Sequence, residues 1–136
     1  MLIVIFHVRK EFFDAILKKE KKIELRIGEK WLKIAEKVMK SKEPVAALIK
    51  WGSKTIVREI WKVEIYPNIR TALGSGRWKL LGLKAKTYPE AIDKVRKIYA
   101  KSKGGRVILF WLRQPKNKEQ LMEIITQSLK KPIHKE

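Results

Sequence analysis

The residues most able to do chemistry lie between Lys18 and Gly28, in the stretch "KKEKKIELRIG". There a lysine-rich run gives way to an alternating one, in which Glu24 stands two residues from Arg26. A carboxylate beside an arginine either forms a salt bridge on a solvated strand face or belongs to a site that handles a charged substrate. The spacing alone leaves both interpretations open.

A second candidate is the segment "GSGRWK", from Gly74 to Lys79. Its two glycines predict a flexible loop, in which Trp78 is a stacking plane between two phosphate-binding cations, Arg77 and Lys79. This pattern favours nucleic-acid binding; the alternative is that Trp78 plugs one end of a barrel and the cations are merely solvated. The other tryptophans fall on apolar periodicities that predict core packing. They are Trp31, Trp51, Trp61 and Trp111.

The charge balance points to an anionic partner. Lys and Arg outnumber Asp and Glu 33 to 14, which gives a formal net charge of +19. An excess of this size repels itself, and nucleic acid is the partner that best explains it. The alternative is a thermophile-like, lysine-rich surface, but in such surfaces glutamate usually balances lysine.

Composition also narrows the function classes. The chain has no cysteine, so it has no disulfide framework and no thiolate metal site, and two histidines are too few for a convincing zinc centre. We therefore expect no metal and no cofactor. The longest apolar runs are too short to cross a bilayer, and the N-terminus is typical of a strand rather than a signal peptide. These features predict a cytoplasmic protein without a membrane partner; a monomer is favoured, with the oligomeric state left open.

Apolar periodicity predicts the elements that position these residues. The length of 136 residues fits one domain. The expected strands cover 2–8, 22–27, 44–51, 55–66 and 106–112, and the expected helices cover 10–19, 29–41, 87–99 and a C-terminal segment from Asn117. The strand at 106–112 has charges only at its ends, which is typical of a central strand buried on both faces. This order predicts an α+β fold around a small, mostly antiparallel or mixed sheet or barrel, flanked by helices.

With the motif "KEKKIELR" and this order of elements, the chain resembles the ASCH domain, a small β-barrel module related to the RNA-binding PUA domain. The family motif, Gly-x-Lys-x-x-Glu/Thr-x-Arg, places its functional positions on Lys21, Glu24 and Arg26, while Lys19 stands where the family has glycine. The later helix supplies Glu90. The resemblance covers residues 1–113, which we expect to form the ASCH domain, with 114–136 as a C-terminal helix and basic tail.

The resemblance implies a PUA-like barrel that binds RNA or another nucleic acid through a basic cleft. The residues expected to line or border this cleft are Lys21, Lys22, Glu24, Arg26, Arg77, Trp78, Lys79 and Glu90. One branch of the family resembles an amidohydrolase for acetylated cytidine, in which a threonine nucleophile occupies the position of Glu24.

The same residues leave a catalytic alternative open. Glu24 or Glu90 could activate a water or a ribose hydroxyl while Lys21 stabilises negative charge, as a metal-independent hydrolase of RNA or of a modified nucleoside requires. The structural alternative is that Glu90, three residues after Thr87, completes a capping box and needs no chemistry. A third hypothesis is an interaction module whose C-terminal helix docks on a protein partner.

Overall fold

The computed structural model describes residues 2–102, 104–116, 119, 123 and 126. Its strands are β1 (Ile3–His7), β2 (Ile23–Ile27), β3 (Val45–Trp51), β4 (Lys54–Tyr66) and β5 (Val107–Arg113). Its helices are α1 (Lys10–Leu17), α2 (Glu29–Lys40), α3 (Ile69–Ala72) and α4 (Tyr88–Ile98), with a 3₁₀ turn, η1 (Arg77–Leu80).

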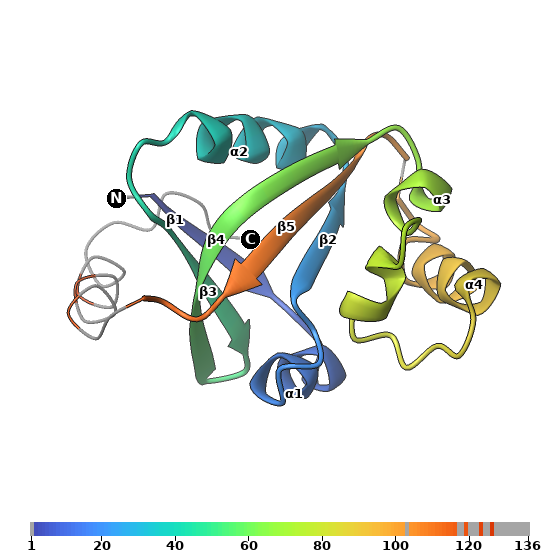
Figure 1. The fold of residues 1–136 in the computed structure, drawn as a ribbon, viewed down its shortest axis with the longest axis horizontal. Coiled ribbons are helices and arrows are strands. Elements are labelled where there is room, and N and C mark those ends of the chain that lie inside the picture. The colour runs from blue at the N-terminus through green and yellow to red at the C-terminus, as the bar shows by residue number, and fades with distance from the viewer. Residues whose placement is uncertain (1, 103, 117–118, 120–122, 124–125, 127–136) are drawn as a thin grey trace.

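The five strands form a single curled sheet in the order β1-β3-β4-β5-β2 (Figure 1). The β1–β3 pair is parallel, and the pairs β3–β4, β4–β5 and β2–β5 are antiparallel. The sheet is therefore mixed and shaped as a half-barrel, so the predicted α+β fold is confirmed and the shape is consistent with a small PUA-like barrel. The expectation that β5 is central is also confirmed, because it lies between β4 and β2 and its first four residues are buried.

One face of the sheet is covered by α2, which lies along that side in Figure 1. The helix forms because its apolar residues recur at helical spacing and so share one face. Its buried residues are Trp31, Leu32, Ile34, Ala35 and Val38. They pack on side chains of β1 and β5, among which Phe6 stacks on Trp31 with ring centroids 5.4 Å apart.

At one end of the sheet α3, η1 and α4 cover the opposite face and form a second core with β2 and β5 (Figure 1). The side chain of Thr87 caps α4, and Pro89 lies in its first turn, where its missing N–H costs no helical hydrogen bond. The segment before it is more ordered than the sequence suggests. Asn68 follows β4 and caps α3 by accepting a hydrogen bond from Thr71 N at 2.8 Å.

The longest strand, β4, contains a β-bulge at Trp61. Residues up to Ile60 pair with β3, residues from Glu59 onward pair with β5, and the register shifts between Ile60 and Lys62. The prediction that Trp61 packs in the core is wrong, because its side chain is 46% exposed. Strict alternation places Trp61 inward, but a bulge inserts one extra residue and re-aims its side chain.

The predicted C-terminal helix cannot be compared with the structure. Its proposed cap, Asn117, and its apolar stripe, Leu121, Met122, Ile125 and Leu129, lie outside the described residues. Within the described part of the chain, none of the helices has the length and apolar character needed to cross a membrane.

Candidate functional site

A tight turn after α1 delivers Lys21 to the sheet. Lys19 adopts the left-handed conformation, with a φ of 64°. Glu20 N then donates to Ala15 O at 2.9 Å, and Lys19 N donates to Ile16 O at 3.0 Å. This pair of bonds is a Schellman motif, which usually has glycine at the left-handed position. The turn is therefore kept although Lys19 stands where the ASCH-domain motif has glycine.

Lys21 is buried and fully bonded. Its Nζ donates to Ile23 O at 2.7 Å and to Leu81 O at 2.9 Å, and it lies 3.2 Å from Glu24 Oε1. The side chains of Lys21 and Glu24 are only 5% and 7% exposed. Because an ammonium group has three donors, these three acceptors satisfy it completely.

The other carboxylate oxygen of Glu24 binds Arg26. Glu24 Oε2 accepts from Arg26 Nε at 3.0 Å and lies 2.8 Å from Arg26 Nη2. The same Nη2 donates to His7 O at 3.0 Å, and the guanidinium lies 4.9 Å from the ring centroid of Trp31. The motif residues thus form one chain, Lys21–Glu24–Arg26, that ties β2 to β1 and α2.

The two buried charges shift each other's titration. Burial lowers the pKa of Lys21, and the neighbouring carboxylate of Glu24 only partly opposes this. Burial alone would raise the pKa of Glu24, but the charges of Lys21 and Arg26 and their hydrogen bonds outweigh it and lower the pKa. Glu24 is therefore held as a carboxylate, which suits an electrostatic anchor.

A small cavity of about 40 Å³ borders this pair. The residues that line it include Lys21, Glu24 and Tyr99, and the hydroxyl of Tyr99 donates to Leu25 O. A cavity of this size has room for a single water molecule or a small functional group. It is the place where chemistry at the motif residues would occur.

A larger pocket of about 350 Å³ shares Phe12, Leu83 and Ile98 with the small cavity. It carries four basic side chains and one acidic one. We call it the basic cleft and define it by Arg9, Lys84, Lys94 and Lys97, with Glu11 as its acid; none of the residues that the sequence predicts for such a cleft lines this pocket.

Glu90 is held apart from the motif residues. Its N–H donates to Thr87 Oγ1 at 3.3 Å, its Oε2 accepts from Lys86 N at 2.9 Å, and its Oε1 lies 3.7 Å from Lys94 Nζ. Glu90 does not line the small cavity beside Lys21 and Glu24. These contacts are those of a helix cap, with an ion pair to a residue of the basic cleft.

Arg77, Trp78 and Lys79 of the "GSGRWK" segment lie on η1, and the two glycines precede it. Arg77 donates to Ala72 O and Thr71 O, each at 2.8 Å, and so closes the end of α3. Trp78 is partly buried against the second core, and Lys79 is exposed, with its Nζ 5.6 Å from the Trp78 ring centroid. Arg77 and Trp78 therefore have structural contacts, and Lys79 is the member of the triplet that faces solvent.

Sequence reasoning missed a pocket of about 440 Å³ around Trp61 and Trp111. We call it the tryptophan pocket. The basic residues that line it are Lys19, Lys21, Lys22, Arg58 and Arg113, and among the described lining residues there is no acid. Lys22, which the sequence predicts to bind nucleic acid, is exposed here rather than beside Glu24. The available signal was the aromatic–cation adjacency in "WK" and "WLR", the same feature that singles out Trp78.

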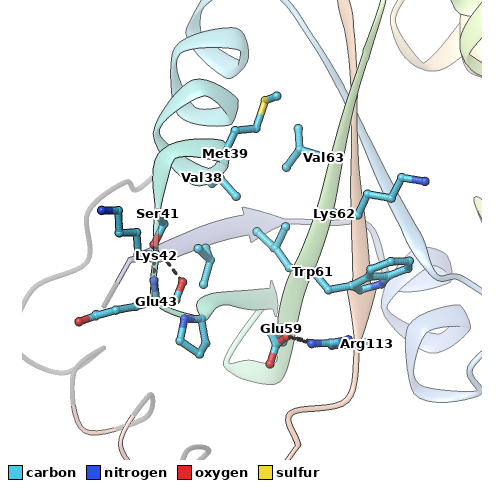
Figure 2. Close-up of a pocket in the computed structure, with 13 residues that line it drawn as sticks. Val38, Met39, Ser41, Lys42, Glu43, Glu59, Trp61, Lys62, Val63 and Arg113 are labelled. Carbon is cyan, nitrogen blue, oxygen red and sulfur yellow. Dashed lines mark hydrogen bonds and ion pairs between the residues drawn. The ribbon is translucent and has the colours of Figure 1, made fainter.

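Trp61 stands at the border of two hollows. Figure 2 shows it projecting from β4, away from Met39 of α2 and close to Arg113, which is ion-paired with Glu59. The hollow drawn there has a volume of about 410 Å³ and lies beside the end of α2. The tryptophan pocket lies against the ring of Trp111, whose centroid is 5.8 Å from that of Trp61.

In the described part of the chain, no three His, Asp or Glu side chains come together as a potential metal site.

No protein-family model and no curated protein matches the sequence. Among solved structures, hypothetical protein PH0355 aligns with a TM-score of 0.62 at 17% identity, over 83% of this chain and 98% of its own. Protein PF0455 from Pyrococcus furiosus aligns with a TM-score of 0.55 at 18% identity, over 85% of this chain and 100% of its own.

A mutant of the ZmASCH protein from Zymomonas mobilis aligns at 17% identity and a TM-score of 0.49, over 93% of this chain and 83% of its own. That alignment is too loose to support a conclusion. The similarity to PH0355 and PF0455 shows a shared fold. This half-barrel agrees with the ASCH-like domain that the sequence motif implies.

Proposed function

We propose that this chain is an ASCH-type domain, spanning residues 1–113, that binds nucleic acid, RNA in particular, as a cytoplasmic protein. The observation that carries the proposal is the basic cleft, where Arg9, Lys84, Lys94 and Lys97 surround an apolar floor next to the motif residues. Cations gathered around a hollow attract phosphates and release counterions on binding. The net charge of +19 supports the same class of partner.

The test is a salt titration of binding to a labelled single-stranded RNA, a structured RNA and a duplex DNA. We expect an RNA preference that persists at physiological salt, since a dedicated site adds contacts beyond phosphate attraction. The variant with Lys94→Ala and Lys97→Ala removes two cations of the cleft. Its matched control carries Lys33→Ala and Lys37→Ala, which removes two exposed cations from α2.

For a single strand, the slope of log affinity against log salt becomes shallower by about 0.7 for every phosphate that the protein no longer neutralises. We expect the cleft variant to show a shallower slope and a weaker affinity than the α2 control. Equal reductions in the two variants would show that the charge acts only as a general field. Equal binding of all three nucleic acids, abolished by moderate salt, would contradict the proposal.

A hydrolase acting on RNA or on a modified nucleoside is the second candidate. The observation that favours it is the small cavity beside two buried ionisable groups, one of which, Lys21, has its pKa lowered by burial. Perturbed groups beside a cavity are a common property of active sites. Of the three residues that the sequence proposes for catalysis, Lys21 and Glu24 border this cavity and Glu90 does not.

The hydrolase is tested by following RNA length on a gel, and the release of base products, with a chelator present. The catalytic hypothesis expects turnover that is abolished in Glu24→Gln and kept in Glu90→Gln, because only Glu24 borders the cavity. Turnover that survives Glu24→Gln in a folded variant would exclude this assignment.

A further inference from the structure

We propose that the tryptophan pocket binds an unpaired base of a single-stranded RNA segment, with the neighbouring phosphates held by the cations around it. This inference rests on the proposed function and adds to it a second surface, distinct from the basic cleft, and a preference for unpaired strands. It begins from the exposure of Trp61, because an exposed aromatic ring beside cations offers a stacking plane next to groups that bind phosphate.

The two rings form a fixed platform. The bulge holds Trp61 out of the sheet, and its ring meets that of Trp111 edge-on, with an interplanar angle of 69°. Trp111 is fixed in turn, since its Nε1 donates to Glu64 Oε1 at 2.6 Å while Glu64 Oε2 accepts from Tyr66 at 2.9 Å. A rigid aromatic plane loses little entropy when a base stacks on it.

The charges select an anionic ligand. Of the five basic side chains in the described lining, Lys21 is paired with Glu24 and Arg113 with Glu59, whereas Lys19, Lys22 and Arg58 have no acidic partner among the described residues. Lys62 lies beside the pocket, with its Nζ 5.1 Å from the Trp111 ring centroid and 3.7 Å from Glu64 Oε2. Arg58 is half-buried and donates to the carbonyl oxygens of Val57 and Ile16, so its charge is desolvated while its described partners are neutral. An anion would compensate this charge directly.

An aromatic ring and a phosphate occur together in a nucleotide, and the volume of about 440 Å³ falls in the range of small-ligand sites. A base within a duplex is already stacked on its neighbours and cannot reach the face of Trp61. A single strand exposes its bases for stacking on aromatic side chains. The chemistry therefore favours an unpaired strand over a double helix.

The test compares a short unstructured RNA with its own duplex, using full-length protein and the variants Trp61→Ala and Trp61→Phe. We expect Trp61→Ala to weaken single-strand binding by about 5- to 100-fold, which is the range for removing one base–aromatic stack. Trp61→Phe should retain most of the affinity, because it keeps a stacking plane. Duplex binding should change little in either variant.

Charge is tested separately with Lys62→Ala against Lys33→Ala. Each variant removes one exposed lysine, but only Lys62 lies against the two rings, whereas Lys33 is on α2 across the sheet. We expect Lys62→Ala to lose more affinity for single-stranded RNA than Lys33→Ala. If Trp61→Ala does not fold, this comparison tests whether the RNA binds beside the two rings. Wild-type protein that binds no RNA would overturn the proposed function and this site with it.

Wild-type binding that is unchanged in Trp61→Ala would overturn this site alone and leave the basic cleft as the binding surface. Poly-glutamate is the competitor that identifies the ligand class. If poly-glutamate displaces RNA from the wild type, and Trp61→Ala weakens poly-glutamate binding as much as RNA binding, the pocket binds an acidic protein segment and the proposal is wrong. Failure of poly-glutamate to compete at the same charge concentration supports the nucleotide.

Discussion

Lys21 and Glu24 form a buried ion pair, with Nζ 3.2 Å from Oε1, and this pair fastens the turn after α1 to strand β2. Lys21 also reaches Leu81 O on the segment that leads to α4, while Glu24 reaches Arg26. The motif that suggests a functional site is therefore also a structural joint. Its stability and its function have to be measured separately.

The two halves of this joint should differ in their effect on stability. Glu24→Gln leaves the ammonium of Lys21 buried without its carboxylate, which should lower the free energy of unfolding by about 3–5 kcal/mol. Lys21→Met leaves Glu24 paired with Arg26, so we expect a smaller decrease. Urea unfolding at neutral pH measures both, with Glu20→Gln on the exposed surface as the control. The reverse order would show that Arg26 does not compensate the carboxylate.

The lowered pKa of Glu24 makes the stability pH-dependent on the acid side. A carboxyl whose pKa in the folded state lies below its ordinary value of 4.5 stabilises the fold above that value. This contribution is lost as the pH falls through the folded-state pKa, because the unfolded chain then binds more protons. We expect unfolding free energy to fall steeply below pH 4.5 in wild type and less steeply in Glu24→Gln. Parallel pH profiles for the two proteins would contradict this origin.

The left-handed turn before the motif should be improvable. Lys19 has a φ of 64°, a conformation that costs a side-chain-bearing residue about 1–2 kcal/mol but costs glycine little. Lys19→Gly should therefore raise the free energy of unfolding by roughly 0.5–1 kcal/mol after the added chain entropy is deducted. Its neighbour Lys18 has a φ of −78°, so Lys18→Gly should lower stability instead. Thermal unfolding of both variants measures whether Lys19→Gly raises the stability and Lys18→Gly lowers it.

Gly82 should resist substitution because it packs directly on Lys21. A Cβ built on Gly82 would lie 3.0 Å from the Cβ atoms of Ala15 and Lys21, and its φ is +70°. Gly76 has a similar φ, +77°, with no atom within 4 Å of such a Cβ. Both alanine variants carry the backbone strain, but Gly82→Ala should cost about 1–3 kcal/mol more from overpacking. Equal destabilisation in urea unfolding would show that the contact with Lys21 relaxes freely.

Local pattern was enough to predict most of the fold. The alternation in β2 and the helical spacing in α2 both depend on residues near one another in sequence, and the structure keeps them. The bulge at Trp61 could not be predicted this way, because it depends on how β4 leaves β3 and continues along β5. The sequence did not predict α3 either, because its single turn is too short to show a helical periodicity.

The candidate site shows the same difference between contacts that are local in sequence and contacts that depend on the whole fold. Lys21, Glu24 and Arg26 meet because they lie within six residues on a turn and a strand, so the motif itself was sufficient. The position of Glu90 depends on how α4 packs, and its N–H meets Thr87 Oγ1 as the cap spacing predicts. The tryptophan pocket joins α1, β4 and β5, which lie far apart in the sequence, and so only the fold reveals it.

The most direct test of RNA binding by this chain is photocrosslinking to a single-stranded RNA that carries 4-thiouridine, followed by trypsin digestion and mass spectrometry. Trp61 and Trp111 fall on separate tryptic peptides, 59–62 and 107–113. We expect RNA adducts on these two peptides and on peptides from the basic cleft, reduced by unlabelled single strand and not by duplex. Wild-type protein that forms no adduct at low salt would contradict the account.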